Sequence, residues 1–181
     1  MNESPPDNSL DTAGLATELV TAQQTNGVDA MLSQLEETLR ENRRWHGLFD
    51  ARLLRARAVL GLPLVGPLTQ AASTLREQLD QQTIAACREV GWGLFEDGQI
   101  AGGWMYLRAS VDQHEVVERL QALAEKLLAG MGAGDSDEEA FQPLQEIMQL
   151  ALWEGLDPTL GIRVMLTAQG TCNAITAYEQ S

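Results

Sequence analysis

The sequence predicts an all-α fold of stacked antiparallel helical hairpins, with eight or nine helices. Apolar residues recur three and four positions apart along most of the chain, which is the helical period. Glycine and Asn-Gly, Asp-Gly or Asp-Pro pairs separate these periodic segments. Large apolar residues never alternate with polar ones over a useful length, as a strand would require. We therefore expect residues 1–8 to form a disordered tail and residues 9–181 to form a single helical-repeat-like domain.

Four helices are expected in the first half of the chain. They cover approximately residues 11–24, 29–42, 45–60 and 71–96. The pair Asn26-Gly27 ends the first helix, because both residues tolerate the left-handed conformation of a helix stop. A very short turn near Arg43 and Arg44 separates the second helix from the third. A turn this short requires the two helices to lie antiparallel.

Residues 61–70 interrupt the helical pattern. Pro63, Gly66 and Pro67 exclude a regular helix there, yet the segment also contains several apolar residues. Two alternatives remain open. The segment either folds onto the core or forms an exposed apolar lip that binds another molecule.

Five further helices are expected in the second half. They cover residues 100–109, 112–129, 138–154, 157–170 and the segment that follows Thr171. Asp112 and Glu115 have the spacing of a capping box, and Asp157-Pro158 is typical of a helix start. Residues 130–137 are glycine-rich and predict a flexible linker. Pro143 would be tolerated if its helix begins close by.

Helical spacing also predicts which side chains are buried. In residues 45–60 the expected buried face is Trp45, Phe49, Leu53, Ala56 and Leu60. In residues 112–129 it is Val116, Val117, Leu120, Leu123, Leu127 and Leu128. In residues 138–154 it is Phe141, Leu144, Ile147, Met148, Ala151 and Leu152.

Residues 85–110 have a pattern of small and large residues that is specific enough to suggest a family. The pattern consists of Gly91, Leu94, Gly98, Gly103, Leu107 and Ser110. In this order and spacing the segment resembles one tetratricopeptide repeat, although Gly103 and Ser110 stand where alanine is usual. The resemblance implies two antiparallel helices whose backbones touch at small residues, and stacked hairpins that expose a groove for a peptide. The chain also resembles an uncharacterised bacterial family with this hairpin arrangement.

The resemblance does not extend regularly along the chain. Residues 28–60 form a similar hairpin, but Leu48 and Arg52 occupy positions where a small and an aromatic residue are usual. The resemblance therefore implies hairpin stacking with one good repeat and not a regular array.

Composition narrows the classes of partner. The net charge is −14, which repels nucleic acid and anionic membranes and favours a basic partner or simple solubility. Six of the twelve basic residues fall between Arg40 and Arg57. The chain has two distant cysteines, no signal-peptide pattern and no apolar run long enough for a membrane span. We expect a cytoplasmic protein with no cofactor and no metal.

The candidate binding residues lie at the tip of the second hairpin. They are Arg40, Arg43, Arg44, Trp45 and His46. Spacings of three and four would place the three arginines on one helix face, where guanidinium groups can bind carboxylates in pairs and Trp45 can stack. We hypothesise that this tip binds an acidic peptide or another anion. The alternative is that these arginines pair with Glu36, Glu37 and Glu41, and that the tryptophan belongs to the core.

Three other groups of residues are candidates for a functional role. Trp92 lies off the face of Val90, so it either belongs to the core or lines a groove. His114 opens a zinc-protease-like pattern, but the second histidine is missing, which favours a solvated residue. The acids at Asp135 and residues 137–139 lack the ligand order of a calcium loop.

The sequence favours a protein-interaction or scaffold module. Its partner would be a protein or peptide, and its oligomeric state is open. Two alternatives remain. The chain could be a structural or regulatory domain of a larger protein, or an enzyme with a site assembled from scattered carboxylates and arginines.

Overall fold

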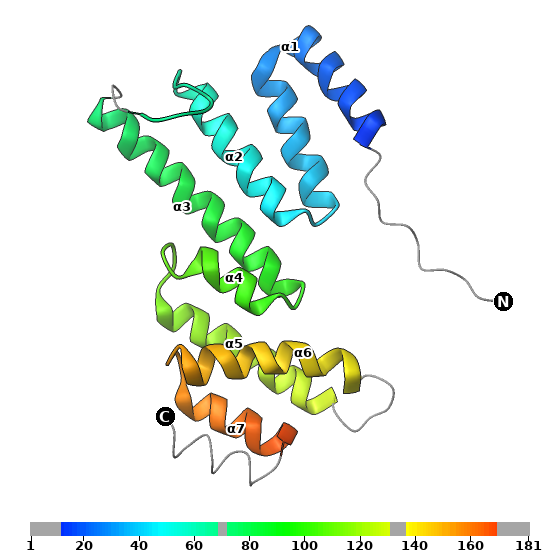
Figure 1. Cartoon of the computed structure of the whole chain (residues 1–181), viewed down its shortest axis with the longest axis vertical. Helices are drawn as coiled ribbons and strands as arrows, with labels where there is room; N and C mark the ends of the chain where they lie inside the picture. The colour runs from blue at the N-terminus through cyan, green and yellow to red at the C-terminus, as the bar shows by residue number, and fades with distance from the viewer. Residues whose placement is uncertain (1–11, 69–71, 131–136, 170–181) are drawn as a thin grey trace, which may run out of the picture. The chain divides into compact units, whose positions relative to one another are not determined.

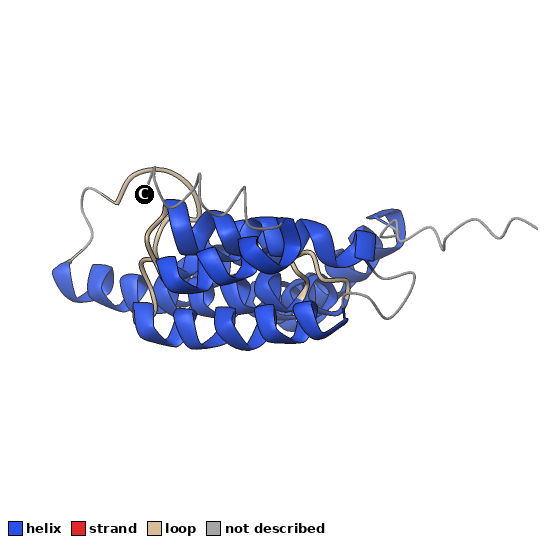
Figure 2. Ribbon diagram, turned by 90° about the horizontal axis from the view of Figure 1, so that it is seen from below, coloured by secondary structure: helices blue, strands red, loops and turns tan. Residues whose placement is uncertain are grey.

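The computed structural model describes residues 12–68, 72–130 and 137–169, and within these ranges it contains helices and loops but no strand (Figures 1 and 2). The elements are α1 (Thr12–Glu41), α2 (Trp45–Val59), α3 (Ser73–Glu96), α4 (Ile100–Leu107), α5 (Gln113–Gly130), α6 (Asp137–Met148), the π-helix η1 (Gln149–Trp153) and α7 (Pro158–Gln169). The all-α prediction is confirmed. No helix among the described residues is both long and apolar enough to cross a membrane.

The predicted count of eight or nine helices is wrong, because the described residues form seven α-helices. The first two expected helices are joined in α1, and the ninth, after Thr171, lies outside the described residues together with the tail 1–8 and linker residues 131–136. The chain divides into two compact units, residues 1–86 and 87–181, with the boundary inside α3. The single domain over residues 9–181 stays a prediction.

In the first unit, α1 is bent at Gly27. This residue has φ 85° and ψ 179°, a conformation that is essentially restricted to glycine. The predicted boundary at Asn26-Gly27 is therefore confirmed as a break in the backbone, even though helical residues continue on both sides. Figure 1 shows the two halves of α1 as an inverted V, with the second half packed beside α2.

The buried face of α2 differs from the predicted one. Leu48 and Ala51 are fully buried, whereas Trp45 and Phe49 are only partly buried. Leu48 and Ala51 share their side of the helix with Arg52 and Arg55, which form ion pairs with the buried Glu36 of α1. The prediction counted only apolar residues as buried, so it missed a face on which arginine stems accompany apolar side chains.

The loop after α2, of which residues 61–68 are described, is partly buried and partly exposed. Leu62 is buried, whereas Leu64 and Val65 are exposed. The Arg57 guanidinium donates hydrogen bonds from Nη1 to the carbonyl oxygens of Pro63 and Gly66, both at 3.2 Å. One part of the loop therefore joins the core, and the other part forms an apolar tip that Arg57 holds in shape.

In the second unit, α3 and α4 cross at two glycines. A Cβ added to Gly91 would lie 2.5 Å from Leu107 Cγ, and one added to Gly103 would lie 2.7 Å from the Gly91 carbonyl oxygen and would also collide with Phe95. Because no other residue lets two backbones come so close, the predicted small sites at Gly91 and Gly103 are confirmed.

The core of this unit is formed mainly by the faces that helical spacing predicts. Its fully buried members include Leu107, Val116, Leu120, Ala124, Leu144, Ile147, Ala151 and Val164. The Asp112 carboxylate accepts a hydrogen bond from the His114 N–H at 2.7 Å, so Asp112 does cap α5. The Glu115 carboxylate accepts hydrogen bonds from Arg88 of α3 at 2.8 and 2.9 Å. Glu115 therefore binds α3 in place of completing the predicted capping box.

The predicted helix 138–154 is interrupted. Its last turn is the π-helix η1, in which the backbone is wider than in an α-helix. Leu150 is buried although the predicted face does not include it, and Phe141, which that face does include, is 42% exposed. Pro143 lies inside α6 and not near its start.

The start of α7 is confirmed at Asp157-Pro158. The Asp157 carboxylate accepts hydrogen bonds from the Leu160 N–H at 3.0 Å and from Gln121 Nε2 at 2.9 Å. Partial burial alone would raise the pKa of Asp157, but the hydrogen bonds from Gln121, Leu160 and Thr159, together with the charge of Arg163, lower it. Asp157 thus joins α5 to the first turn of α7.

Candidate functional site at the α1–α2 turn

The turn between α1 and α2 is closed by two backbone hydrogen bonds. The Arg43 N–H donates to the carbonyl oxygen of Arg40 at 3.0 Å, and the Arg44 N–H donates to that of Leu39 at 2.8 Å. This pattern is a Schellman motif, in which the residue after the helix adopts the left-handed conformation. That residue is Arg43, with φ 53°. The predicted short turn near Arg43 and Arg44 is confirmed.

Within the part of the chain that the structure describes, the same motif occurs after two other helices, and in both cases glycine occupies the left-handed position. After α2, Gly61 has φ 64°, and its N–H donates to Ala58 at 3.1 Å while the Leu62 N–H donates to Arg57 at 2.9 Å. After α3, Gly98 has φ 77°. The Gly98 N–H donates to the carbonyl oxygen of Phe95 at 3.0 Å, and the Gln99 N–H donates to that of Leu94 at 2.9 Å.

Arg43 is the one non-glycine residue with positive φ among the described residues. A side chain in this conformation brings Cβ close to the neighbouring carbonyl oxygen, which costs about 1–2 kcal/mol relative to the right-handed region. Two equivalent turns of this chain avoid that cost with glycine. Backbone strain of this kind is concentrated at functional positions. The side chain of Arg43 is therefore a candidate for a functional role.

The other predicted site residues surround Arg43, but they do not share one helix face. Because α1 ends at Glu41, Arg43 and Arg44 lie in the turn, and helical spacing does not relate them to Arg40. Arg43, Arg44 and His46 are exposed. Trp45 is partly buried, so it is less enclosed than the predicted core alternative requires.

The alternative, in which these arginines form ion pairs within the chain, is met by Arg40. Arg40 Nη1 donates to Glu37 Oε2 at 2.6 Å. Glu36, by contrast, faces α2 and pairs with Arg55 at 3.3 Å and Arg52 at 3.6 Å. Glu36 is therefore engaged away from the turn.

The ion pairs of Glu36 lie between α1 and α2, and the pattern of apolar residues in the sequence does not predict them. The Glu36 side chain is only 4% exposed, and its Oε1 atom has no hydrogen-bond partner, while Oε2 faces the two arginines. Arg55 Nε also donates to Asp29 at 2.8 Å. This hydrogen bond lowers the pKa of Asp29 and raises the pKa of Arg55. The pairing fixes how α1 and α2 align, and so it positions the turn between them.

Two further predicted residues lie in the second unit. Trp92 is 9% exposed, packs edge-on against Phe95 with ring centroids 5.4 Å apart, and carries the Arg119 guanidinium 3.8 Å above its ring. This is the placement expected of a core aromatic. His114 is exposed and lies 3.3 Å from Glu118, as expected of a solvated residue.

The described residues contain no group of three side chains suited to holding a metal ion. The structure does not describe the acidic side chains at positions 135 and 137–139.

Comparison with known proteins found no matching family model, no matching curated protein and no matching solved structure.

Proposed function

We propose that this protein is an interaction module whose α1–α2 turn binds an acidic segment of a partner protein. The observation that carries the proposal is the strained backbone of Arg43. Glycine would relieve the strain, as it does at Gly61 and Gly98 in the same motif. A side chain kept in the less stable conformation is best explained by what that side chain does.

The chemistry of the turn fits a carboxylate-bearing ligand. Arg43 and Arg44 present two exposed guanidinium groups on consecutive residues, and each guanidinium can donate two parallel hydrogen bonds to one carboxylate. His46 follows within the first turn of α2, and it adds positive charge when protonated. The chain as a whole has a net charge of −14, which repels an acidic partner, so the attraction has to come from the basic residues of this turn.

We also propose that the module is a stack of helical hairpins of the tetratricopeptide kind, acting in the cytoplasm and without nucleic acid. The close crossing of Gly91 and Gly103 supports hairpin packing of this kind. The acidic composition supports partners other than nucleic acid.

The test uses a fluorescein-labelled peptide of alternating glutamate and glycine, with an uncharged glutamine–glycine peptide of equal length as the control ligand. We expect the glutamate peptide to bind the wild-type chain and to bind more weakly as salt rises. Replacing Arg43 and Arg44 by glutamate should weaken binding at least about tenfold, because two attractive charges become repulsive.

The matched control replaces Arg108 and Arg163, two exposed arginines of the second unit, by glutamate. This variant has the same net charge as the first, so it separates the turn from the charge of the whole chain. Equal loss of affinity in both variants, or equal binding of both peptides to the wild type, would contradict the proposal.

A further inference from the structure

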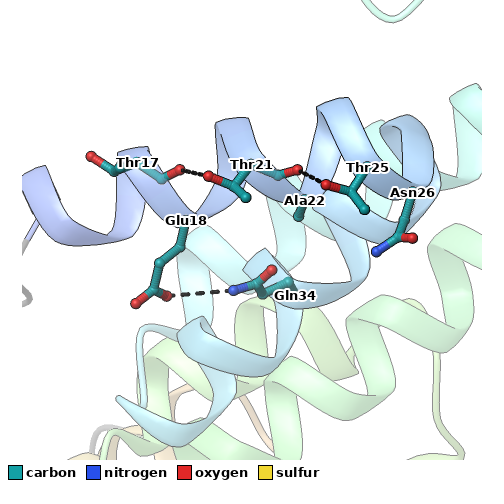
Figure 3. A pocket seen from close by; sticks show the side chains of 7 residues that line it. All are labelled: Thr17, Glu18, Thr21, Ala22, Thr25, Asn26 and Gln34. Atoms are coloured by element: carbon teal, nitrogen blue, oxygen red, sulfur yellow. Dashed lines mark hydrogen bonds between the residues drawn. The ribbon is translucent and has the colours of Figure 1, made fainter.

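The V formed by the two halves of α1 encloses an open hollow of about 380 Å³ (Figure 3). Its lining residues are Thr17, Glu18, Thr21, Ala22, Thr25, Asn26 and Gln34. The first six precede the bend at Gly27 and Gln34 follows it, so the hollow depends on the bend. Its size is within the range of small-ligand sites, which is roughly 300–1,000 Å³.

Three threonines line the hollow along one face of the helix. The hydroxyl of Thr17 donates to the carbonyl oxygen of Ala13 at 3.1 Å, that of Thr21 to Thr17 at 2.9 Å, and that of Thr25 to Thr21 at 2.8 Å. Each hydroxyl proton is therefore committed to the backbone. The oxygen lone pairs that remain can only accept hydrogen bonds from a ligand.

Glu18 adds a negative charge to these acceptors. Figure 3 shows Glu18 and Gln34 pointing toward each other across the hollow, and Gln34 Nε2 lies 3.4 Å from Glu18 Oε2. At that length the hydrogen bond is weak, so a better donor can replace it. Because the amide nitrogen of Gln34 faces Glu18, its oxygen remains as a further acceptor.

We propose that this hollow binds a primary alkylammonium group. An ammonium carries a positive charge and three diverging N–H donors and has no acceptor, which complements a carboxylate beside hydroxyl oxygens. Phosphates and carboxylates would meet acceptors of their own kind. The group can belong to a free diamine or to a lysine side chain of a partner, and the two sources present the same chemistry. The site is separate from the α1–α2 turn and does not depend on its function.

Isothermal titration calorimetry at constant ionic strength tests the proposal with two probes, 1,4-diaminobutane and the peptide acetyl-Gly-Lys-Gly-amide. Butane-1,4-diol, which has nearly the same shape and no charge, is the negative control. Binding of the diamine alone identifies a free diamine, and binding of the peptide identifies a partner's lysine. Either result supports the ammonium site.

Two variants locate the binding. Glu18→Gln should weaken it about tenfold by removing the charge, and Thr21→Val should weaken it severalfold by removing an acceptor without changing the shape. The matched controls are Glu77→Gln, which makes the same charge change on α3, and Thr83→Val, which removes a hydroxyl bonded to its own helix at 2.8 Å. Both controls should bind as wild type. No heat from either probe up to about 10 mM would overturn the proposal. Equal losses of affinity in Glu18→Gln and Glu77→Gln would also overturn it, because diffuse attraction to an acidic chain would then explain the binding.

Discussion

Two adjacent glycines of α4 should respond to alanine in opposite directions. A Cβ at Gly102 would meet its nearest neighbour, Gln99 Cβ, at 3.9 Å, which is ordinary contact. Gly102→Ala should therefore stabilise the protein by about 1 kcal/mol, which is the helix-propensity difference between the two residues. A Cβ at Gly103 would lie 2.7 Å from the Gly91 carbonyl oxygen and would also collide with the Phe95 ring.

The cost at Gly103 can be estimated from the same geometry. Alanine again gains about 1 kcal/mol of helix propensity, but the two helices must separate, because the atom in the way belongs to the backbone. Overpacking of a close-packed core costs about 1–3 kcal/mol, and a backbone collision belongs at or above the upper end of that range. We expect Gly103→Ala to be less stable than Gly102→Ala by about 3 kcal/mol.

Urea unfolding measures this difference, with tryptophan fluorescence and far-ultraviolet circular dichroism as separate probes. Trp92 and Trp104 belong to or pack against the core at this crossing, so their emission reports its loss. Equal midpoints for the Gly102→Ala and Gly103→Ala variants would refute the close crossing of α3 and α4.

Two further predictions concern carboxylates. Glu36→Gln should destabilise the protein by about 1–3 kcal/mol, because it removes the buried negative charge that Arg52 and Arg55 face. Glu37→Gln, which removes one partner of the exposed pair with Arg40, should change stability by less than about 1 kcal/mol. Thermal unfolding compares the two, and similar midpoints would argue against the importance of the buried pairs. Asp157→Ala should cost about 0.5–2 kcal/mol through loss of the helix cap. Since the folded pKa of Asp157 is lowered, its contribution should be complete above about pH 4 and should disappear as the pH falls through the folded pKa, so unfolding curves of variant and wild type should converge in acid. A difference that persists unchanged at pH 2 would show that ionisation of Asp157 is not involved.

The fold was predictable where local chemistry decides it. The stops at Gly27, Gly61 and Gly98 and the cap at Asp157 follow from backbone preferences that do not depend on distant residues. The close crossing at Gly91 and Gly103 was predictable because residues without a Cβ let two helix backbones touch, as the resemblance of this segment to a tetratricopeptide repeat implies.

The errors arose where distant residues decide the outcome. Arg52 and Arg55 are turned toward α1 because Glu36 lies opposite them, and a pattern of apolar residues cannot show this. The π-helix η1 contains neither proline nor glycine, so the sequence does not mark it, and Leu150 within it is buried outside the predicted face. At the candidate site, the residues at the turn could be named from the sequence, but the left-handed backbone of Arg43 could not, since arginine is not a residue that predicts it.

Arg43→Gly tests the central claim most directly, because one variant answers for stability and binding together. Relief of the left-handed strain, about 1–2 kcal/mol, is partly offset by the greater freedom of glycine in the unfolded chain, about 0.5–1 kcal/mol. We therefore predict a gain in the free energy of unfolding of up to about 1.5 kcal/mol, together with a severalfold loss of affinity for the glutamate peptide. A variant that gains stability and still binds the peptide as tightly as wild type would contradict the claim that the strain at Arg43 serves binding.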